Sequence, residues 1–197
     1  MILQNHNNIT ITSTSTNETI LFCNKLYACI NNTINKKYKL KIVNRILQKF
    51  SIKSLFEANK TSEKTSKISV ILLLNGDLGV GKTFIASNVI KMLLNDHNIA
   101  VASPTFNIVN VYNNAMCKKQ INHYDLYRIK LESELDSIGF YESLLNSVSL
   151  IEWSDIASNY ITKFVKLNKN VIIYDIKITQ NENQRNINFT TTANKKV

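Results

Sequence analysis

The sequence predicts an α/β fold, with a mostly parallel sheet that carries helices on both faces and a C-terminal antiparallel hairpin. Short apolar segments alternate with segments of helical periodicity, and this alternation is typical of parallel strands joined by helices. A glycine-rich segment directly follows a strongly apolar run at 69–74, which indicates a tight turn from a buried strand into a helix. With 197 residues, 44% of them hydrophobic, the chain can form one domain over 1–197 with a substantial core.

Three predicted elements surround the glycine-rich segment in the first half of the chain. A helix is expected at 19–30, with Thr16 or Asn17 as its cap. A strand at 69–75 leads into the glycines, and a helix at 83–94 follows them. Apolar residues of this second helix recur three and four positions apart, so that one of its faces turns toward the core.

The second half alternates strands with one helix. We expect short strands at 99–102, 107–112, 121–125, 148–152, 171–178 and 186–190. A turn at 113–114 would join the second and third of these strands, and residues 180–184 would join the last two as a hairpin. Residues 131–145 suit a helix that turns Leu135, Ile138 and Leu145 inward.

The glycine-rich segment has the pattern of a phosphate-binding loop. It runs Gly76-Asp77-Leu78-Gly79-Val80-Gly81-Lys82-Thr83 and matches G-x-x-x-x-G-K-T. A polyphosphate needs several backbone N–H groups converging on its oxygens, and glycines let the chain curl that tightly. Lys82 is expected to reach the β- and γ-phosphates, the Thr83 hydroxyl to ligate Mg²⁺, and the helix dipole to face the anion. The sequence therefore predicts a nucleoside triphosphate site in a P-loop NTPase-like sheet.

Three later segments place polar groups at the ends of predicted strands, where open α/β sheets have their chemistry. Ser103 and Thr105, in Ser-Pro-Thr-Phe, form either a switch-like loop that faces the γ-phosphate or a plain β-turn. Asp125, in His-Tyr-Asp-Leu-Tyr-Arg, is placed to hold Mg²⁺ through water or to orient a nucleophile. Glu152 ends an apolar strand just before Trp153, as a Walker-B carboxylate does beside its metal.

The net charge of +10 is concentrated at 36–67, which holds ten of the 24 basic residues. Residues 42–50 have helical apolar spacing flanked by Lys41, Arg45 and Lys49, and residues 59–67 form a polar connector. This segment is either a basic helix that contacts RNA or an acidic partner, or a solvated lysine-rich insert. We favour the insert, because lysine is enriched throughout the chain.

No apolar run approaches the roughly 18–20 residues of a membrane span. The chain has three cysteines, an odd number, and none of them forms a C-x-x-C pair. This cysteine usage favours a reducing, cytoplasmic location.

The four motifs together resemble one family. GDLGVGKT, SPTF, HYDLYR and LIEW occur in the order and at the spacing of the bacterial TsaE family, a P-loop ATPase required for threonylcarbamoyladenosine (t6A) modification of tRNA. The resemblance extends from about Val70 to Trp153, and Glu18-Thr19 resembles the family's short N-terminal segment. It implies ATP and Mg²⁺ as cofactors, slow hydrolysis, and a TsaD-like transferase and a TsaB-like subunit as partners. The tRNA would be reached indirectly or through residues 36–67.

The resemblance also implies roles for individual residues. Lys82, Thr105 and Asp125 would serve catalysis, and Thr83 and Glu152 would hold Mg²⁺. The residues that would bind nucleotide are Thr19, Gly76, Asp77, Leu78, Gly79, Val80, Gly81, Lys82, Thr83 and Ser103.

Two departures from the family and three rival functions remain. The segment 36–67 is longer than the family's usual link, and Ser154 stands where the family commonly has proline. A small-molecule kinase normally clamps the transferred phosphoryl group with several arginines, whereas this chain has only Arg45, Arg128 and Arg185. A GTPase would need N-K-x-D, which the sequence lacks. A basic RNA-binding module with a vestigial nucleotide site is the third rival. A nucleotide-gated assembly factor, with slow turnover and partner affinity as its output, overlaps with the resemblance.

Overall fold

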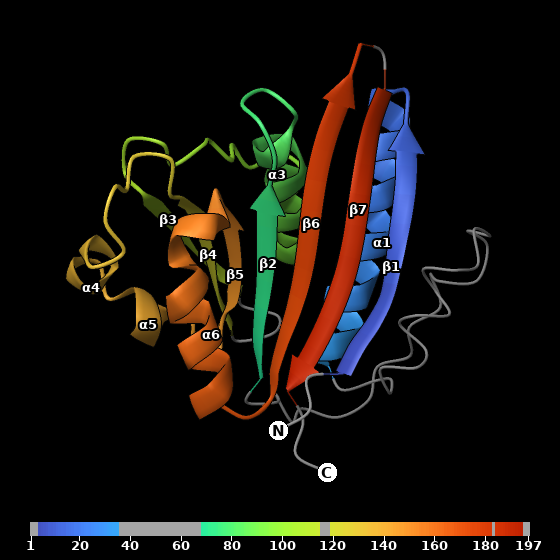
Figure 1. The fold of residues 1–197 in the computed structure, drawn as a ribbon. Coiled ribbons are helices and arrows are strands. Elements are labelled where there is room, and N and C mark those ends of the chain that lie inside the picture. The colour runs from blue at the N-terminus through green and yellow to red at the C-terminus, as the bar shows by residue number, and fades with distance from the viewer. Residues whose placement is uncertain (1–3, 36–67, 115–118, 183, 195–197) are drawn as a thin grey trace.

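A seven-stranded sheet with the order β1-β7-β6-β2-β5-β4-β3 organises the molecule (Figure 1). The computed structural model describes residues 4–35, 68–114, 119–182 and 184–194, and the basic helix predicted within 36–67 lies outside them. The strands are β1 (Gln4–Ser13), β2 (Ser69–Asn75), β3 (Val109–Asn114), β4 (Lys119–Asp125), β5 (Val148–Glu152), β6 (Val171–Asn181) and β7 (Gln184–Asn194). The helices are α1 (Thr16–Ile34), α3 (Lys82–Leu94), α4 (Glu134–Ser137), α5 (Phe140–Ser143), the 3-10 helix η1 (Ser154–Ala157) and α6 (Ser158–Leu167).

The four strands β6, β2, β5 and β4 pair in parallel and form the centre of the sheet. Three strands join them in antiparallel pairs: β3 on β4, β7 on β6, and β1 on β7. The predicted mostly parallel sheet with a C-terminal hairpin is confirmed, and the hairpin strands are longer than expected. Because the parallel strands point the same way, their carboxyl ends meet along one edge.

Helices cover the sheet unevenly (Figure 1). Helices α1 and α3 lie behind the sheet, where Leu26, Val89 and other side chains pack on every second residue of β2, such as Leu72. Helices α4, α5 and α6 lie in front and pack Phe140 and Phe164 on the alternate residues. The prediction of helices on both faces is therefore confirmed around β2, β5 and β4. In front of β7 and β1 the ribbon shows none of the described helices.

The N-terminal segment differs from the prediction in two ways. Strand β1 was not expected, and helix α1 is longer than 19–30. Its cap is Ser15 instead of Thr16 or Asn17. The Ser15 hydroxyl accepts from the Glu18 N–H, and the Glu18 carboxylate accepts from the Thr14 N–H at 2.6 Å. A Ser with Glu three residues later is a capping box, and this pair explains where the helix begins.

Three further expectations were wrong in detail. Residues 99–102 are not a strand, and the strand that pairs with β4 at the edge of the sheet is β3. Residues 113–114 are not a turn but extend β3, and any turn between β3 and β4 lies outside the described residues. The helix expected at 131–145 is divided into α4 and α5 by Gly139, which has φ 60°. Leu135 is buried as predicted, whereas Leu145 is exposed.

Among the helices in the described part of the chain, none is long and apolar enough to cross a bilayer.

Candidate active site

The glycine-rich loop joins the end of β2 to the start of α3 at the carboxyl edge of the sheet (Figure 1). Gly76 has φ 140°, and a Cβ there would lie 2.2 Å from the Ile178 carbonyl oxygen of β6, so that a side chain would clash. Gly81 has φ 102° and precedes α3, which no side chain in the described residues caps. The first amides of α3 are therefore left for an anion, as phosphate binding at a helix N-terminus requires.

Lys82 is buried, and its ammonium group lies inside the loop. Nζ donates hydrogen bonds of 2.7 Å to the carbonyl oxygens of Gly76 and Asp77 and lies 3.8 Å from the ring centre of Trp153. Burial lowers the pKa of Lys82, and the nearby carboxylates, Glu152 first, act to raise it. The loop thus holds a cation next to the helix N-terminus, and both features favour bound phosphate.

Thr83 and Glu152 meet beside Lys82. The Thr83 hydroxyl donates a 2.9 Å hydrogen bond to Oε2 of Glu152, the last residue of β5. The carboxylate is buried, and its other oxygen, Oε1, lies 2.8 Å from Nε2 of His123 on β4. A hydroxyl and a carboxylate in contact are the hard oxygen donors that Mg²⁺ prefers.

Asp125 ends β4 and binds the loop that contains Ser-Pro-Thr-Phe. The hydroxyls of Ser103 and Thr105 donate to Oδ2 at 3.0 and 2.6 Å, and the Tyr127 N–H donates to Oδ1 at 3.1 Å. The same segment is a turn, closed by a 2.6 Å bond from the Ile108 N–H to the Pro104 carbonyl. Ser103 and Thr105 therefore belong to a turn whose hydroxyls face the predicted catalytic carboxylate.

Backbone strain is found next to these loops. Five non-glycine residues have positive φ in the described ranges, and three of them are asparagines, which tolerate this conformation. The other two are Ile108, with φ 65°, which follows the turn, and Trp153, with φ 58°, which follows Glu152. For bulky or β-branched residues such angles are unfavourable, and strain of this kind is common at functional sites.

These groups line one cleft of about 260 Å³. The lining residues are Leu78, Gly79, Gly81, Lys82, Thr83, Ser103, Thr105, Asp125, Glu152 and Trp153. Of the other predicted nucleotide ligands, Gly76 and Asp77 form the start of the loop, and Val80 packs into the core.

Thr19 lies apart from this cleft. Its side chain is buried in the first turn of α1, and its hydroxyl is 2.8 Å from that of Ser13. Ser13 lines a second cleft of about 240 Å³ between the start of α1 and the β6–β7 hairpin, together with Arg185. Thr19 therefore supports the wall of a neighbouring cleft.

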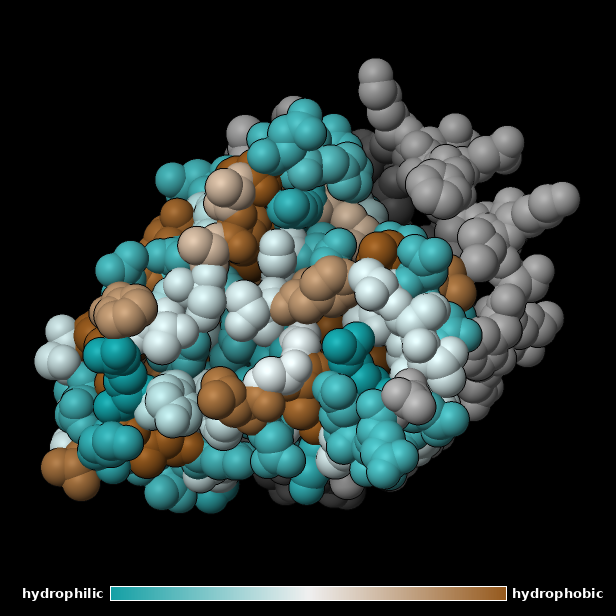
Figure 2. Space-filling view, turned by 90° about the horizontal axis from the view of Figure 1, so that it is seen from above, coloured by the Kyte–Doolittle hydropathy of each residue, from teal (hydrophilic) through white to brown (hydrophobic). Residues whose placement is uncertain are grey.

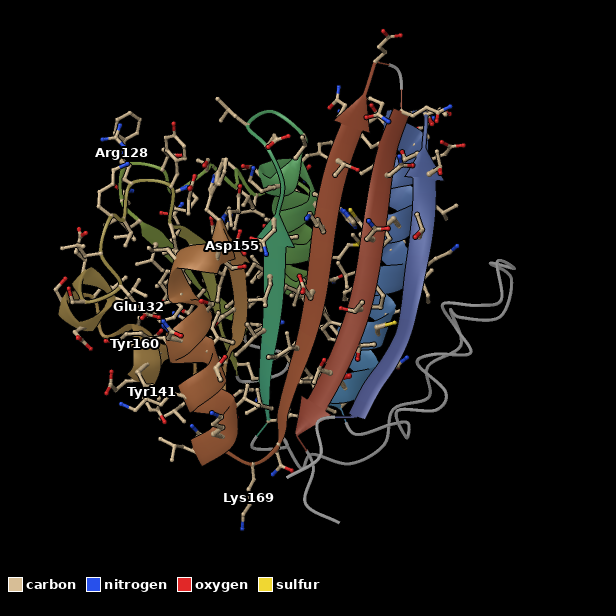
Figure 3. The ribbon with its side chains drawn as sticks, in the orientation of Figure 1. Arg128, Glu132, Tyr141, Asp155, Tyr160 and Lys169 are labelled. Carbon is tan, nitrogen blue, oxygen red and sulfur yellow. The ribbon has the colours of Figure 1, made fainter. Side chains whose placement is uncertain are left out.

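Exposed apolar side chains surround the carboxyl edge. They are Leu78 of the glycine-rich loop, Phe106 of the turn, and Tyr127 and Leu131 after β4. Figure 2 looks down on this edge and shows apolar side chains dispersed among polar ones. Arg128, at the upper left of Figure 3, lies 4.4 Å from the ring centre of Phe106. The edge that contains the cleft is thus partly apolar at its rim.

The donor set suits a Mg²⁺-bound nucleoside triphosphate. The uncapped amides and Lys82 match phosphate oxygens, and Thr83, Glu152 and Asp125 supply hard oxygens. In the described residues, no group of three or more His, Cys, Asp or Glu could hold a metal alone.

The chain matches the family model of the threonylcarbamoyl adenosine biosynthesis protein TsaE over residues 49–187, which is more than half of its length. The chain belongs to the TsaE family. The TsaE of Rickettsia prowazekii is 46% identical over 92 residues, which are 47% of this chain and 62% of the relative. The TsaE of Rickettsia bellii is 36% identical over 126 residues, which are 64% of this chain and 85% of the relative.

Likenesses are also found in organisms other than Rickettsia. The TsaE of Haemophilus influenzae is 38% identical over 88 residues, 44% of this chain and 53% of the relative. The alignment with the Rickettsia prowazekii TsaE described above covers only about three fifths of that relative's length. A crystal structure of YdiB from Bacillus subtilis gives a TM-score of 0.49 and 20% identity, over 96% of this chain and 87% of that one.

Ser154, where the TsaE family commonly has proline, makes contacts that proline could not. Its backbone N–H and its hydroxyl donate to Asn75 Oδ1 at 3.0 and 2.9 Å. Asn75 directly precedes Gly76, so these bonds join the ends of β5 and β2 beneath the glycine-rich loop. A proline lacks both donors.

Sequence reasoning gave no role to His123 and no firm role to Arg185. Side chains alternate along a strand, so His123 and Asp125 of β4 lie on the same side of the sheet. This alternation could have placed His123 near the predicted site and its carboxylate Glu152. Arg185 comes within 3.8 Å of where a Cβ of Gly81 would lie. Only the pairing of β6 with β7 brings it to the glycine-rich loop, and sequence spacing does not predict that proximity.

Proposed function

We propose that this chain is a Mg²⁺-dependent ATPase, one domain over 1–197, that acts in the cytoplasm in t6A modification of tRNA. One observation carries the proposal: an uncapped helix N-terminus, Lys82, the Thr83–Glu152 pair and Asp125 line a single cleft. The name of the relatives, tRNA threonylcarbamoyladenosine biosynthesis protein TsaE, supports the role in tRNA modification. The free, buried thiols of Cys23 and Cys29 agree with a reducing compartment.

Phosphate binding is assigned to the loop and Lys82. The Lys82 ammonium group donates to two carbonyl oxygens of its own loop. Phosphate oxygens carry more negative charge than carbonyls and form stronger bonds with an ammonium group. We therefore expect the Lys82 ammonium group to bind the β- and γ-phosphates together with the first amides of α3.

Hydrolysis is assigned to the groups at the ends of β4 and β5. Thr83 and Glu152 would hold Mg²⁺, which would neutralise charge on the transferred phosphoryl group. Asp125 would orient the attacking water, since its carboxylate lines the same cleft. In the structure Ser103 and Thr105 occupy its Oδ2. Release of this turn from Asp125 would free Oδ2 for the attacking water.

The partners we propose are a TsaD-like transferase and a TsaB-like subunit. The exposed Leu78, Phe106, Tyr127 and Leu131 are the apolar side chains with which the carboxyl edge would contact these partners. A pull-down of both partners from the same source, with and without ATP, tests this assignment. Recovery that does not depend on nucleotide would contradict a nucleotide-gated complex.

The central experiment combines binding and tRNA analysis. The purified chain should bind ATP with Mg²⁺ by calorimetry, and its expression should restore t6A in tRNA of cells depleted of their own TsaE. Thr83→Ala should retain most ATP binding but fail to restore t6A, because it removes a Mg²⁺ ligand. A chain that binds no nucleotide, or whose Thr83→Ala variant restores t6A fully, would refute the proposal.

The basic segment provides the test of the RNA-binding alternative. Replacing Lys41, Arg45, Lys49 and Lys53 by glutamine should leave tRNA association unchanged if the segment is a solvated insert. If it contacts tRNA, association should weaken and its dependence on log salt should flatten by up to about one unit per lost phosphate contact.

A small-molecule kinase is disfavoured because Arg128 lies on Phe106 and, in the described part of the chain, only Arg185 approaches the loop.

A further inference from the structure

His123 is a fully buried histidine on β4, between β5 and the edge strand β3. Its side chain is 0% exposed, and it projects from β4 toward the same side as Asp125. In the parallel register Asp125 lies opposite Glu152, so His123 is two residues earlier on the adjacent strand. This offset lets the ring reach diagonally to Glu152, where Nε2 is 2.8 Å from Oε1.

The two oxygens of Glu152 have separate partners. Oε2 accepts from the Thr83 hydroxyl at 2.9 Å, and Oε1 faces His123. Because a carboxylate can only accept hydrogen bonds, Nε2 of His123 carries the hydrogen in this contact. The ring therefore fixes the rotation of the carboxylate and leaves Oε2 directed to the side of the cleft where Thr83 lies.

Core packing alone does not explain a histidine at this position. Nδ1 is buried and has no hydrogen-bond partner within the described residues. Such unsatisfied buried atoms are uncommon and call for an explanation. Nor is the ring needed to join the strands, because β4 and β5 already pair from Ile121↔Val148 to Asp125↔Glu152. What the histidine supplies is the Nε2–H bond to Glu152.

We propose that His123 is a positioning residue that orients Glu152 for Mg²⁺. The inference rests on the proposed function, in which Glu152 is a metal ligand. Ligating carboxylates are themselves held by hydrogen bonds from a surrounding layer of residues, and loss of such a partner commonly weakens metal affinity about 10- to 100-fold. His123 does not touch the nucleotide cleft itself, since it is absent from the residues that line it.

The experiment measures Mg²⁺ affinity separately from nucleotide affinity. Mg²⁺ is titrated by calorimetry into the protein saturated with ADP, and ADP binding is measured in EDTA. His123→Leu should weaken Mg²⁺ about 10- to 100-fold and leave ADP binding in EDTA unchanged. His123→Gln, whose amide can reach the position of Nε2, should recover most of the Mg²⁺ affinity.

The matched control is Asn122→Leu. Asn122 is equally buried on β4 but donates to the Ser143 carbonyl on the opposite face. Its replacement should lower the melting temperature without changing Mg²⁺ affinity. If His123→Leu fails to fold, His123→Asn takes its place, because the shorter amide cannot reach Oε1. A double-mutant cycle with Glu152→Gln should show that most of the His123→Leu effect disappears in that background.

The outcomes are distinct. Parent-like Mg²⁺ affinity in a folded His123→Leu or His123→Asn variant would overturn the positioning role. So would an equal loss in the Glu152→Gln background, or a folded His123→Gln variant that recovers nothing. If the parent protein binds ADP but shows no Mg²⁺ dependence, or binds no nucleotide, the proposed function fails instead.

Discussion

The two halves of the sheet are built on different plans. Strands β4, β5 and β2 have five to seven residues, pair in parallel with one another, and have helices on both faces. Strands β6, β7 and β1 have ten or eleven residues, pair antiparallel with one another, and have α1 on one face. Every residue of β5 is buried, whereas buried and exposed residues alternate along much of β6.

This difference determines what a polar residue means in each half. On the open face of the antiparallel half, Thr10 donates to Asn188 and Thr12 to Asn186, and these side chains are at the surface. In the parallel half a polar side chain is removed from water and needs an internal partner. His123, Asp125 and Glu152 have such partners, and these partners are the groups of the candidate site. For these three residues of the parallel half, burial coincides with the candidate site, whereas Asn122, equally buried on β4, bonds the Ser143 carbonyl on the opposite face.

The largest expected effect is that of Lys82→Ala. Its removal leaves the β- and γ-phosphate charge without a cation, so ATP binding should weaken and turnover should fall about 100- to 1,000-fold. Lys177→Ala, at an exposed position on β6 in the antiparallel half, is the matched control and should have parent-like kinetics. Steady-state ATPase assays and calorimetry measure both. Full activity of the Lys82 variant would exclude the phosphate-binding role of the loop.

A second prediction separates the two carboxylates of the parallel half. Glu152→Gln keeps the shape but loses the anionic ligand, so the half-activating Mg²⁺ concentration should rise about 10- to 100-fold. Asp125→Asn should lower kcat about 100-fold with little change in ATP affinity, since its role is in the transition state. Mg²⁺ titrations of kcat and KM distinguish them. If both folded variants have parent kinetics, neither carboxylate belongs to the reaction.

A third prediction compares two glycines with positive φ. Gly76→Ala places a Cβ 2.2 Å from Ile178 O, where β6 of the antiparallel half supports the loop. It should reduce the free energy of unfolding by about 3 kcal/mol and weaken ATP binding. Gly139→Ala meets nothing within 4 Å and should cost about 1 kcal/mol, from its φ alone. Urea unfolding gives both free energies of unfolding. Equal losses in the two variants would show that the backbone at Ile178 moves away from the new Cβ at little energetic cost.

The sequence predicts the parallel half well for the same physical reason. Strands buried on both faces appear as continuous apolar runs, so β2 and β5 were located correctly, and the polar residues at their ends stand out. The glycine-rich loop is equally visible, because positive φ and close backbone approach demand glycine.

The antiparallel half is harder to predict. Strand β1 is largely polar, with Ile9 and Ile11 against the core, and its partner β7 is remote in sequence. Contacts between elements also escape sequence reasoning. The bonds from His123 to Glu152 and from Ser154 to Asn75 depend on the register of neighbouring strands, which no local pattern encodes.

The smallest expected effect concerns Asp175 on the open face of β6. Its side chain is exposed, but it lies in a groove with Asp155, which is labelled near the start of α6 in Figure 3. Desolvation by the surrounding groups, and then Asp155, raise the pKa of Asp175, while Lys177 acts to lower it. The folded state therefore binds the proton more tightly than the unfolded state. Stability should fall as pH rises from the ordinary aspartate value of about 3.9 through the raised pKa, and the penalty persists at neutral pH.

Asp175→Asn removes this penalty because the amide does not ionise. At pH 7 its melting temperature should be slightly higher than that of the parent, and the difference should disappear near pH 3, where the parent carboxyl is protonated in both states. ATPase kinetics should stay unchanged, since Asp175 does not line the nucleotide cleft. Asp125→Asn is the counterpart in the parallel half, where the same chemical change should cost turnover. If Asp175→Asn lowered turnover as Asp125→Asn does, the open face of the antiparallel half would also belong to the site.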